Sequence, residues 1–154
     1  MDSPKIGLVF VMAEECAVYL AEKAVEYLRH NAPNLEYVIN ADVPGLSNVE
    51  NGSLDTPVIR IFEGGSLIDP MFGIRAAERC RSKGLDFELS GARSGSQTRL
   101  FIPIAKALSI ALPNSEAHLP RTKMSLKGIE RTITLLKTIG EETLSGFGIS
   151  VCAC

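Results

Sequence analysis

A turn rich in glycine and serine is the part of the chain best suited to bind an anion. Residues 91–96, reading GARSGS, connect a predicted strand to a predicted helix. The N–H groups of such a turn and the unpaired donors of the first helical turn converge at the carboxyl end of the strand, where a phosphate group fits. Ser94, Gly95 and Ser96 are therefore predicted to form an anion-binding turn.

Charge is distributed unevenly around this turn. Residues 93–131 contain seven basic and two acidic side chains, a net charge of +5, whereas residues 1–70 contain four basic and eleven acidic ones, a net charge of −7. The total of −2 therefore hides a polarised molecule, and a one-sided field favours attraction to a polyanion. A solvated basic face without a partner is the alternative. The side chains predicted to contact the polyanion are Arg93, Gln97, Arg99, Arg121, Lys123 and Lys127.

Alternating α and β patterns must position these side chains. Short runs of branched apolar residues predict strands at residues 5–12, 35–39, 85–91 and 146–152. Residues 57–69 are typical of a β-hairpin with a two-residue glycine turn. Apolar residues at helical spacing and capping residues predict helices at residues 14–30, 70–84, 97–112 and 125–139. Residues 40–56 are predicted to be a long loop.

These elements predict an α/β fold in a single domain, residues 1–154. Two related βαβ-type halves, residues 1–69 and 70–154, are expected to share a mixed sheet. The sequence APNLE at residues 32–36 reappears as LPNSE at residues 112–116, in each case after a predicted helix. Because proline and asparagine commonly end helices, this similarity also has a purely local explanation.

Composition restricts the class of protein. At 154 residues and 45% hydrophobic, the chain can bury a sizeable core. No apolar run approaches the length of a membrane span, and the first residues lack the pattern of a signal peptide, so a cytoplasmic protein is expected. The four cysteines form no CxxC pair and the two histidines lie far apart. The sequence therefore predicts no metal site and no cofactor, and leaves the oligomeric state open.

Residues 92–126, reading ARSGSQTRLFIPIAKALSIALPNSEAHLPRTKMSL, resemble the signature of Brix-domain proteins, especially the archaeal ones. The signature combines a Ser/Arg-rich turn, a helix start with Thr-Arg-x-Phe, an amphipathic helix ending in Pro-Asn-Ser, and a basic segment ending in Ser-Leu. The matching residues are Arg93, Ser96, Gln97, Thr98, Arg99, Phe101, Leu108, Pro113, Asn114, Ser115, Arg121, Lys123, Met124, Ser125 and Leu126.

The resemblance implies a non-enzymatic factor of ribosome biogenesis that binds ribosomal RNA or a pre-ribosomal particle, and that would be nucleolar in a eukaryote. It also implies two α/β halves similar to the anticodon-binding domain of some aminoacyl-tRNA synthetases. No catalytic residue is expected under this interpretation.

Two other classes remain open. The turn at residues 91–96 could instead hold a sugar phosphate or a nucleotide in a small-molecule enzyme or sensor, although no general base is evident beside it. Alternatively, the acidic residues 1–70 could dock on a basic partner, in which case the chain is a protein-interaction subunit.

Overall fold

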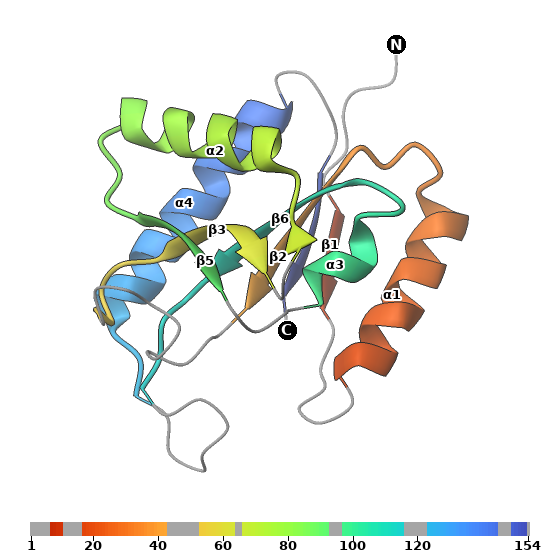
Figure 1. Ribbon diagram of the computed structural model, residues 1–154, viewed down its shortest axis with the longest axis horizontal. Coiled ribbons are helices and arrows are strands. Elements are labelled where there is room, and N and C mark those ends of the chain that lie inside the picture. The colour runs from red at the N-terminus through yellow and green to blue at the C-terminus, as the bar shows by residue number, and fades with distance from the viewer. Residues whose placement is uncertain are drawn as a thin grey trace.

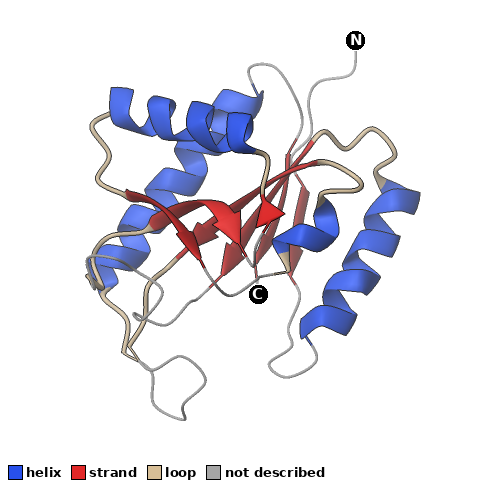
Figure 2. Cartoon of the chain, viewed as in Figure 1, coloured by secondary structure: helices blue, strands red, loops and turns tan. Residues whose placement is uncertain are grey.

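The computed structural model describes residues 7–10, 17–42, 53–63, 66–92, 97–115, 123–144 and 149–153. These residues form a mixed sheet flanked by helices (Figures 1 and 2). The strands are β1 (Gly7–Phe10), β2 (Tyr37–Asp42), β3 (Val58–Glu63), β4 (Ser66–Leu67), β5 (Glu88–Ala92), β6 (Lys106–Ala111) and β7 (Ile149–Ala153). The helices are α1 (Ala17–Asn31), α2 (Pro70–Ser82), α3 (Thr98–Phe101) and α4 (Leu126–Leu144).

The sheet has a parallel part and an antiparallel part. β1, β7, β2 and β6 lie side by side and run parallel. β3 pairs antiparallel with β6, parallel with β5 and antiparallel with the two-residue β4. Since the four parallel strands point the same way, their carboxyl ends meet at one edge of the sheet. In α/β sheets, ligands bind outside this carboxyl edge.

Helices cover both faces of the sheet. α2 and α4 pack on one face, over a core that includes Ile39, Ile59 and Leu108. α1 and α3 pack on the opposite face, against residues such as Val38 and Ala107. Figure 1 shows the two helix pairs on opposite sides of the strands. Consecutive residues along β2, and likewise along β6, therefore point toward different pairs of helices. Because both faces of these strands are covered, the strands are apolar on both sides.

The predicted α/β class and mixed sheet are confirmed. The start of α2 follows the predicted pattern, because the Asp69 carboxylate accepts a hydrogen bond from the Phe72 N–H at 2.9 Å and Pro70 occupies the first turn. Gly84, after the helix, has a φ of 69°, a conformation that favours glycine. The predicted hairpin is present as β3 and β4.

The helix predicted at residues 97–112 is wrong. α3 contains only Thr98–Phe101, and β6 begins at Lys106. Pro103 would fall beyond the first turn of a longer helix, where its ring clashes with the preceding turn and it cannot donate a backbone hydrogen bond. The following apolar run is buried from Ala107 to Ala111. Such a run suits a central strand as well as a buried helix, so its spacing did not separate the two.

The two predicted halves are interleaved in the sheet. β2, from the first half, lies between β7 and β6 from the second. The predictions of a single domain and of two related halves remain predictions. Within the described ranges, none of the helices is long and apolar enough to cross a membrane.

Candidate functional site at the carboxyl edge and on the α1/α3 face

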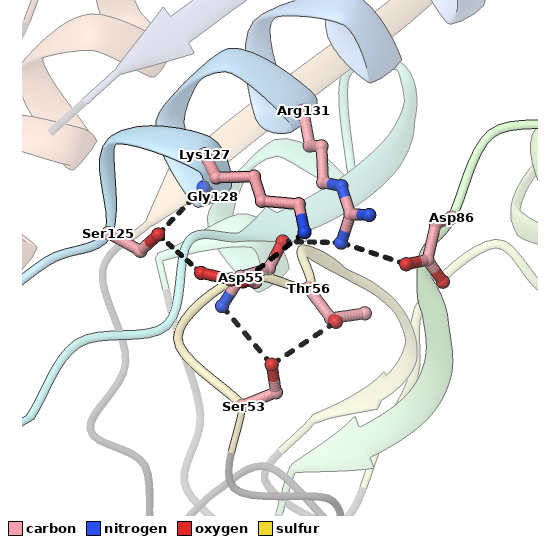
Figure 3. Close-up of polar contacts among 8 residues, drawn as sticks. All are labelled: Ser53, Asp55, Thr56, Asp86, Ser125, Lys127, Gly128 and Arg131. Carbon is pink, nitrogen blue, oxygen red and sulfur yellow. Dashed lines mark hydrogen bonds and ion pairs between the residues drawn. The ribbon is translucent and has the colours of Figure 1, made fainter.

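The loop before β3 contacts the beginning of α4 through a network of polar side chains (Figure 3). Asp55, in this loop, accepts a hydrogen bond from the Ser125 hydroxyl, and its second carboxylate oxygen lies 3.6 Å from the Lys127 ammonium. Ser125 also caps α4, because its hydroxyl oxygen accepts a bond from the Gly128 N–H at 3.3 Å. The Asp55 carboxylate therefore joins the loop to the start of the helix.

Arg131 extends this network along α4. Its guanidinium donates to the Asp55 carbonyl at 3.1 Å and pairs with the Asp86 carboxylate at 2.8 Å. A Cβ atom at Gly128 would overlap the Leu54 carbonyl oxygen, so glycine is needed for the loop to approach the helix this closely. Val58, just after the loop, pairs with Ala111 at the end of β6. The network therefore lies at the carboxyl edge of the parallel strands.

The Ser125 hydroxyl, followed in importance by the charge of Lys127, lowers the pKa of the Asp55 carboxyl below its ordinary value. A lowered carboxyl pKa in the folded state contributes stability above the ordinary aspartate pKa, and this contribution is lost as the pH falls through the lowered value. Asp55 therefore stays ionised in neutral solution.

We expect Ser125→Ala to raise the pKa of Asp55 toward its ordinary value, because the largest stabilising contact of the carboxylate is removed. The pKa can be measured by following the Asp55 carboxyl carbon by NMR as the pH is lowered. Ser53→Ala is the control, since the Ser53 hydroxyl accepts from the Asp55 backbone N–H and not from its carboxyl. An equal shift in both variants would contradict the assignment.

A second polar cluster lies inside the sheet. Asn40 of β2, Ser109 of β6 and Arg60 of β3 are direct register partners on three adjacent strands. Residues opposite one another in a sheet point to the same face. Asn40 donates to the Thr98 hydroxyl of α3 at 3.0 Å, so this is the face covered by α1 and α3. All four side chains belong to buried residues.

An irregularity in β3 brings Glu63 to the same face. The pairing of β3 with β5 shifts between Arg60 and Phe62, so that Arg60 lies opposite Ser90 and Glu63 opposite Ala92. Side chains alternate along a strand, so Ser90 and Ala92, two residues apart, point to the same face of the sheet. Their partners Arg60 and Glu63 are three residues apart, but because of the bulge they also point to one face. A regular strand would have placed them on opposite faces.

The bulge places Glu63 in contact with Arg60 and Ser109. The Arg60 guanidinium donates to the Glu63 carboxylate at 3.0 Å, and the Ser109 hydroxyl donates to the same oxygen at 2.7 Å. The same guanidinium nitrogen lies 3.9 Å from the carboxylate of Asp42, the last residue of β2. The Asp42 side chain is 29% exposed, compared with 3% for Arg60. The buried cluster therefore reaches the carboxyl edge at Asp42.

The predicted site residues are only partly described. Arg93, Ser94, Gly95, Ser96 and Arg121 lie outside the described residues.

Gln97 directly precedes the short α3, and Arg99 lies within this helix and is exposed. Lys123 is exposed, and its backbone pairs with that of Ser115 in an isolated β-bridge. Lys127 lies in the first turn of α4, on the opposite face. Since α3 and α4 cover opposite faces, these helices do not present Arg99 and Lys127 on one surface. Lys127 is also paired with Asp55. No finding tests whether these individual side chains belong to a binding site.

Sequence reasoning missed the buried cluster. The segment Val58–Glu63, VIRIFE, suggests regular alternation, in which a central arginine faces solvent. Arg60 is instead 2% exposed. The available signal was the presence of Arg60 and Glu63 in an otherwise apolar strand. The contact between their two charges, however, depends on the bulge and on the neighbouring strands.

In the part of the chain that the structure describes, no three histidine, cysteine, aspartate or glutamate side chains gather closely enough to hold a metal ion. The cluster of Asp42, Arg60, Glu63 and Ser109 is thus one of ion pairs and hydrogen bonds among the described residues.

Comparison with solved structures identifies the same fold in peptidases. The dodecameric TET aminopeptidase PhTET1-12s superposes with a TM-score of 0.66 at 15% identity, covering 84% of this chain and 39% of that one. Aminopeptidase APDkam598 from the archaeon Desulfurococcus kamchatkensis gives 0.65 at 19% identity, with coverages of 85% and 39%. An endoglucanase from Thermotoga maritima gives 0.57 at 18% identity, with coverages of 86% and 40%.

These similarities establish the fold. No protein-family model matches the chain, and no curated protein matches it in sequence. The chain spans about two-fifths of the length of the solved structures that share its fold.

The Brix resemblance, and with it the non-enzymatic RNA-binding interpretation and its role in ribosome biogenesis, is wrong. The solved structures described above that share this fold are aminopeptidases and an endoglucanase, not Brix-domain proteins. The structure gives the physical reason, because the signature requires an amphipathic helix where this chain has α3 and the central strand β6. The similar residue types are therefore arranged on a different backbone. The expectation of a protein without enzymatic activity is overturned by the same comparison.

Proposed function

We propose that this chain forms the sheet and part of the active site of a peptide-hydrolysing enzyme, with Asp42 as its functional carboxylate. The observation that supports this most is the position of Asp42 at the carboxyl end of β2, a central parallel strand, in a fold shared with aminopeptidases. Sites in α/β sheets gather at this edge. A fold alone does not determine the substrate, which depends on the residues of the site.

Asp42 has the exposure and the surroundings that such a role requires. Its side chain is part-exposed, whereas the Arg60 guanidinium beside it is buried and also held by Glu63. A carboxylate at this position can accept a proton from the water that attacks a peptide carbonyl. Arg60 then acts as a positioning residue, because its guanidinium lies 3.9 Å from the Asp42 carboxylate and is itself held by Glu63.

We expect the purified chain to hydrolyse aminoacyl p-nitroanilides, and Asp42→Asn to lower kcat/KM by roughly a hundredfold or more, the contribution of one general base. The release of p-nitroaniline, followed by its absorbance across a panel of amino acids with and without added divalent ions, measures this.

Glu36→Gln is the matched control, since Glu36 is an exposed carboxylate just before the amino end of the same strand. It is expected to leave kcat/KM unchanged. Absence of turnover across the whole panel would contradict the proposed function. Equal losses in the two variants would contradict the role of Asp42.

A further inference from the structure

Two buried side chains of the sheet each keep a polar atom without a hydrogen-bond partner among the residues that the structure describes. One is the donor Nη2 of Arg60, and the other is the acceptor Oδ1 of Asn40. The two residues are 2% and 0% exposed, respectively. Leaving a buried donor or acceptor unpaired is costly, so a pair of them on one face of a sheet indicates that something else satisfies them.

The two atoms belong to one location. Asn40 and Arg60 both lie opposite Ser109, one on each side of β6. Their Cα atoms are therefore two strand spacings apart, roughly 10 Å, a gap that an arginine side chain largely spans. Gln97, the residue before Thr98, also has a buried Oε1 without a partner among the described residues.

The charges around the pair restrict the ligand. The Arg60 guanidinium already lies beside two carboxylates, those of Glu63 at 3.0 Å and Asp42 at 3.9 Å. A further anion would be repelled by both carboxylates. A neutral amide has the complementary groups, since its carbonyl oxygen can accept from Nη2 of Arg60 and its N–H can donate to Oδ1 of Asn40.

We propose that Arg60 and Asn40 bind a backbone amide of a peptide, in a subsite that holds the substrate beside Asp42. The identification of this peptide as the substrate rests on the proposed function, whereas the amide-binding site itself does not. The site is distinct from the Asp55 network on α4, because Asn40 contacts α3 on the opposite face.

The test is a titration of the isotope-labelled full chain with N-acetylglycinamide, followed by NMR at the side-chain N–H signals of Arg60 and Asn40. We expect saturable shifts of these signals, and no comparable shifts with acetate. Asn40→Ala should weaken binding roughly fivefold to tenfold, the loss expected for one neutral hydrogen bond.

Asn114→Ala is the matched control. Asn114 is 4% exposed and its Oδ1 also lacks a partner, but it follows β6 instead of lying in this row. Its replacement should leave the affinity unchanged. If Asn40→Ala does not fold, the comparison of amide with acetate in the unaltered chain still decides the question.

Two results would overturn the inference. Saturable shifts with acetate as large as those with the amide would make this an anion site, and no shifts with either would mean that water satisfies the two atoms. Hydrolysis without shifts at Arg60 would remove the subsite and leave the proposed function. Shifts without hydrolysis would support the amide-binding site and contradict the proposed function.

Discussion

Arg60→Met is expected to lower the free energy of unfolding by about 3 to 5 kcal/mol, because it leaves the buried Glu63 carboxylate without its arginine. The two side chains are 3% and 2% exposed, and water cannot replace the lost contact. Urea unfolding followed by circular dichroism measures the change. Adding Glu63→Gln should recover much of the loss, since glutamine removes the charge and still accepts from the Ser109 hydroxyl.

The control is Lys23→Met on α1. Lys23 and Glu26 form an ion pair of the same spacing in sequence, with a nitrogen to oxygen distance of 2.8 Å compared with 3.0 Å for Arg60 and Glu63. Their side chains are 54% and 58% exposed, so the expected change in stability is much smaller than that for Arg60→Met. Similar losses for the two variants would show that Arg60 and Glu63 are solvated, contrary to the packing of the sheet.

Leu108→Ala is expected to cost about 2 to 5 kcal/mol, because it opens a cavity in the middle of β6. Leu108 is 0% exposed and packs among the residues between the sheet and the α2 and α4 helices. Thermal or urea unfolding provides the measurement.

Leu126→Ala provides the comparison. Leu126 has the same side chain but is 80% exposed at the start of α4, so its truncation should change the stability by no more than about 0.5 kcal/mol. A small loss at Leu108 would contradict the central position of β6.

Local sequence determined several elements correctly, for identifiable reasons. Asp69 and Pro70 specify the start of α2, and Gly84 adopts the positive φ that ends it. The alternating apolar residues around Ile59 predicted the hairpin of β3 and β4, which forms. In each case a few neighbouring residues supply the physical cause, so the pattern needs no information from distant parts of the chain.

The central strand β6 lay beyond such local reasoning. Its apolar residues are buried from both sides, between α2 and α4 on one face and α1 and α3 on the other. Periodicity disappears when both faces of an element are buried, and helix and strand then look alike. Pro103 was the one local signal against a helix. The Brix resemblance relied on the same helix, so the misassigned element and the mistaken family have a common origin.

What the sequence by itself determined is the α/β class and the uneven distribution of charge; where the charges meet was decided by the tertiary structure. Arg60 contacts Glu63 because β3 carries a bulge, and Arg60 lies near Asp42 because β6 brings β2 and β3 together. Lys127, predicted as part of a basic surface, is paired with Asp55 from the loop before β3. The same carboxylate accepts a hydrogen bond from Ser125, which lies 70 residues later in the chain. Electrostatic contacts act through space over a few ångströms, and only the folded backbone sets those distances.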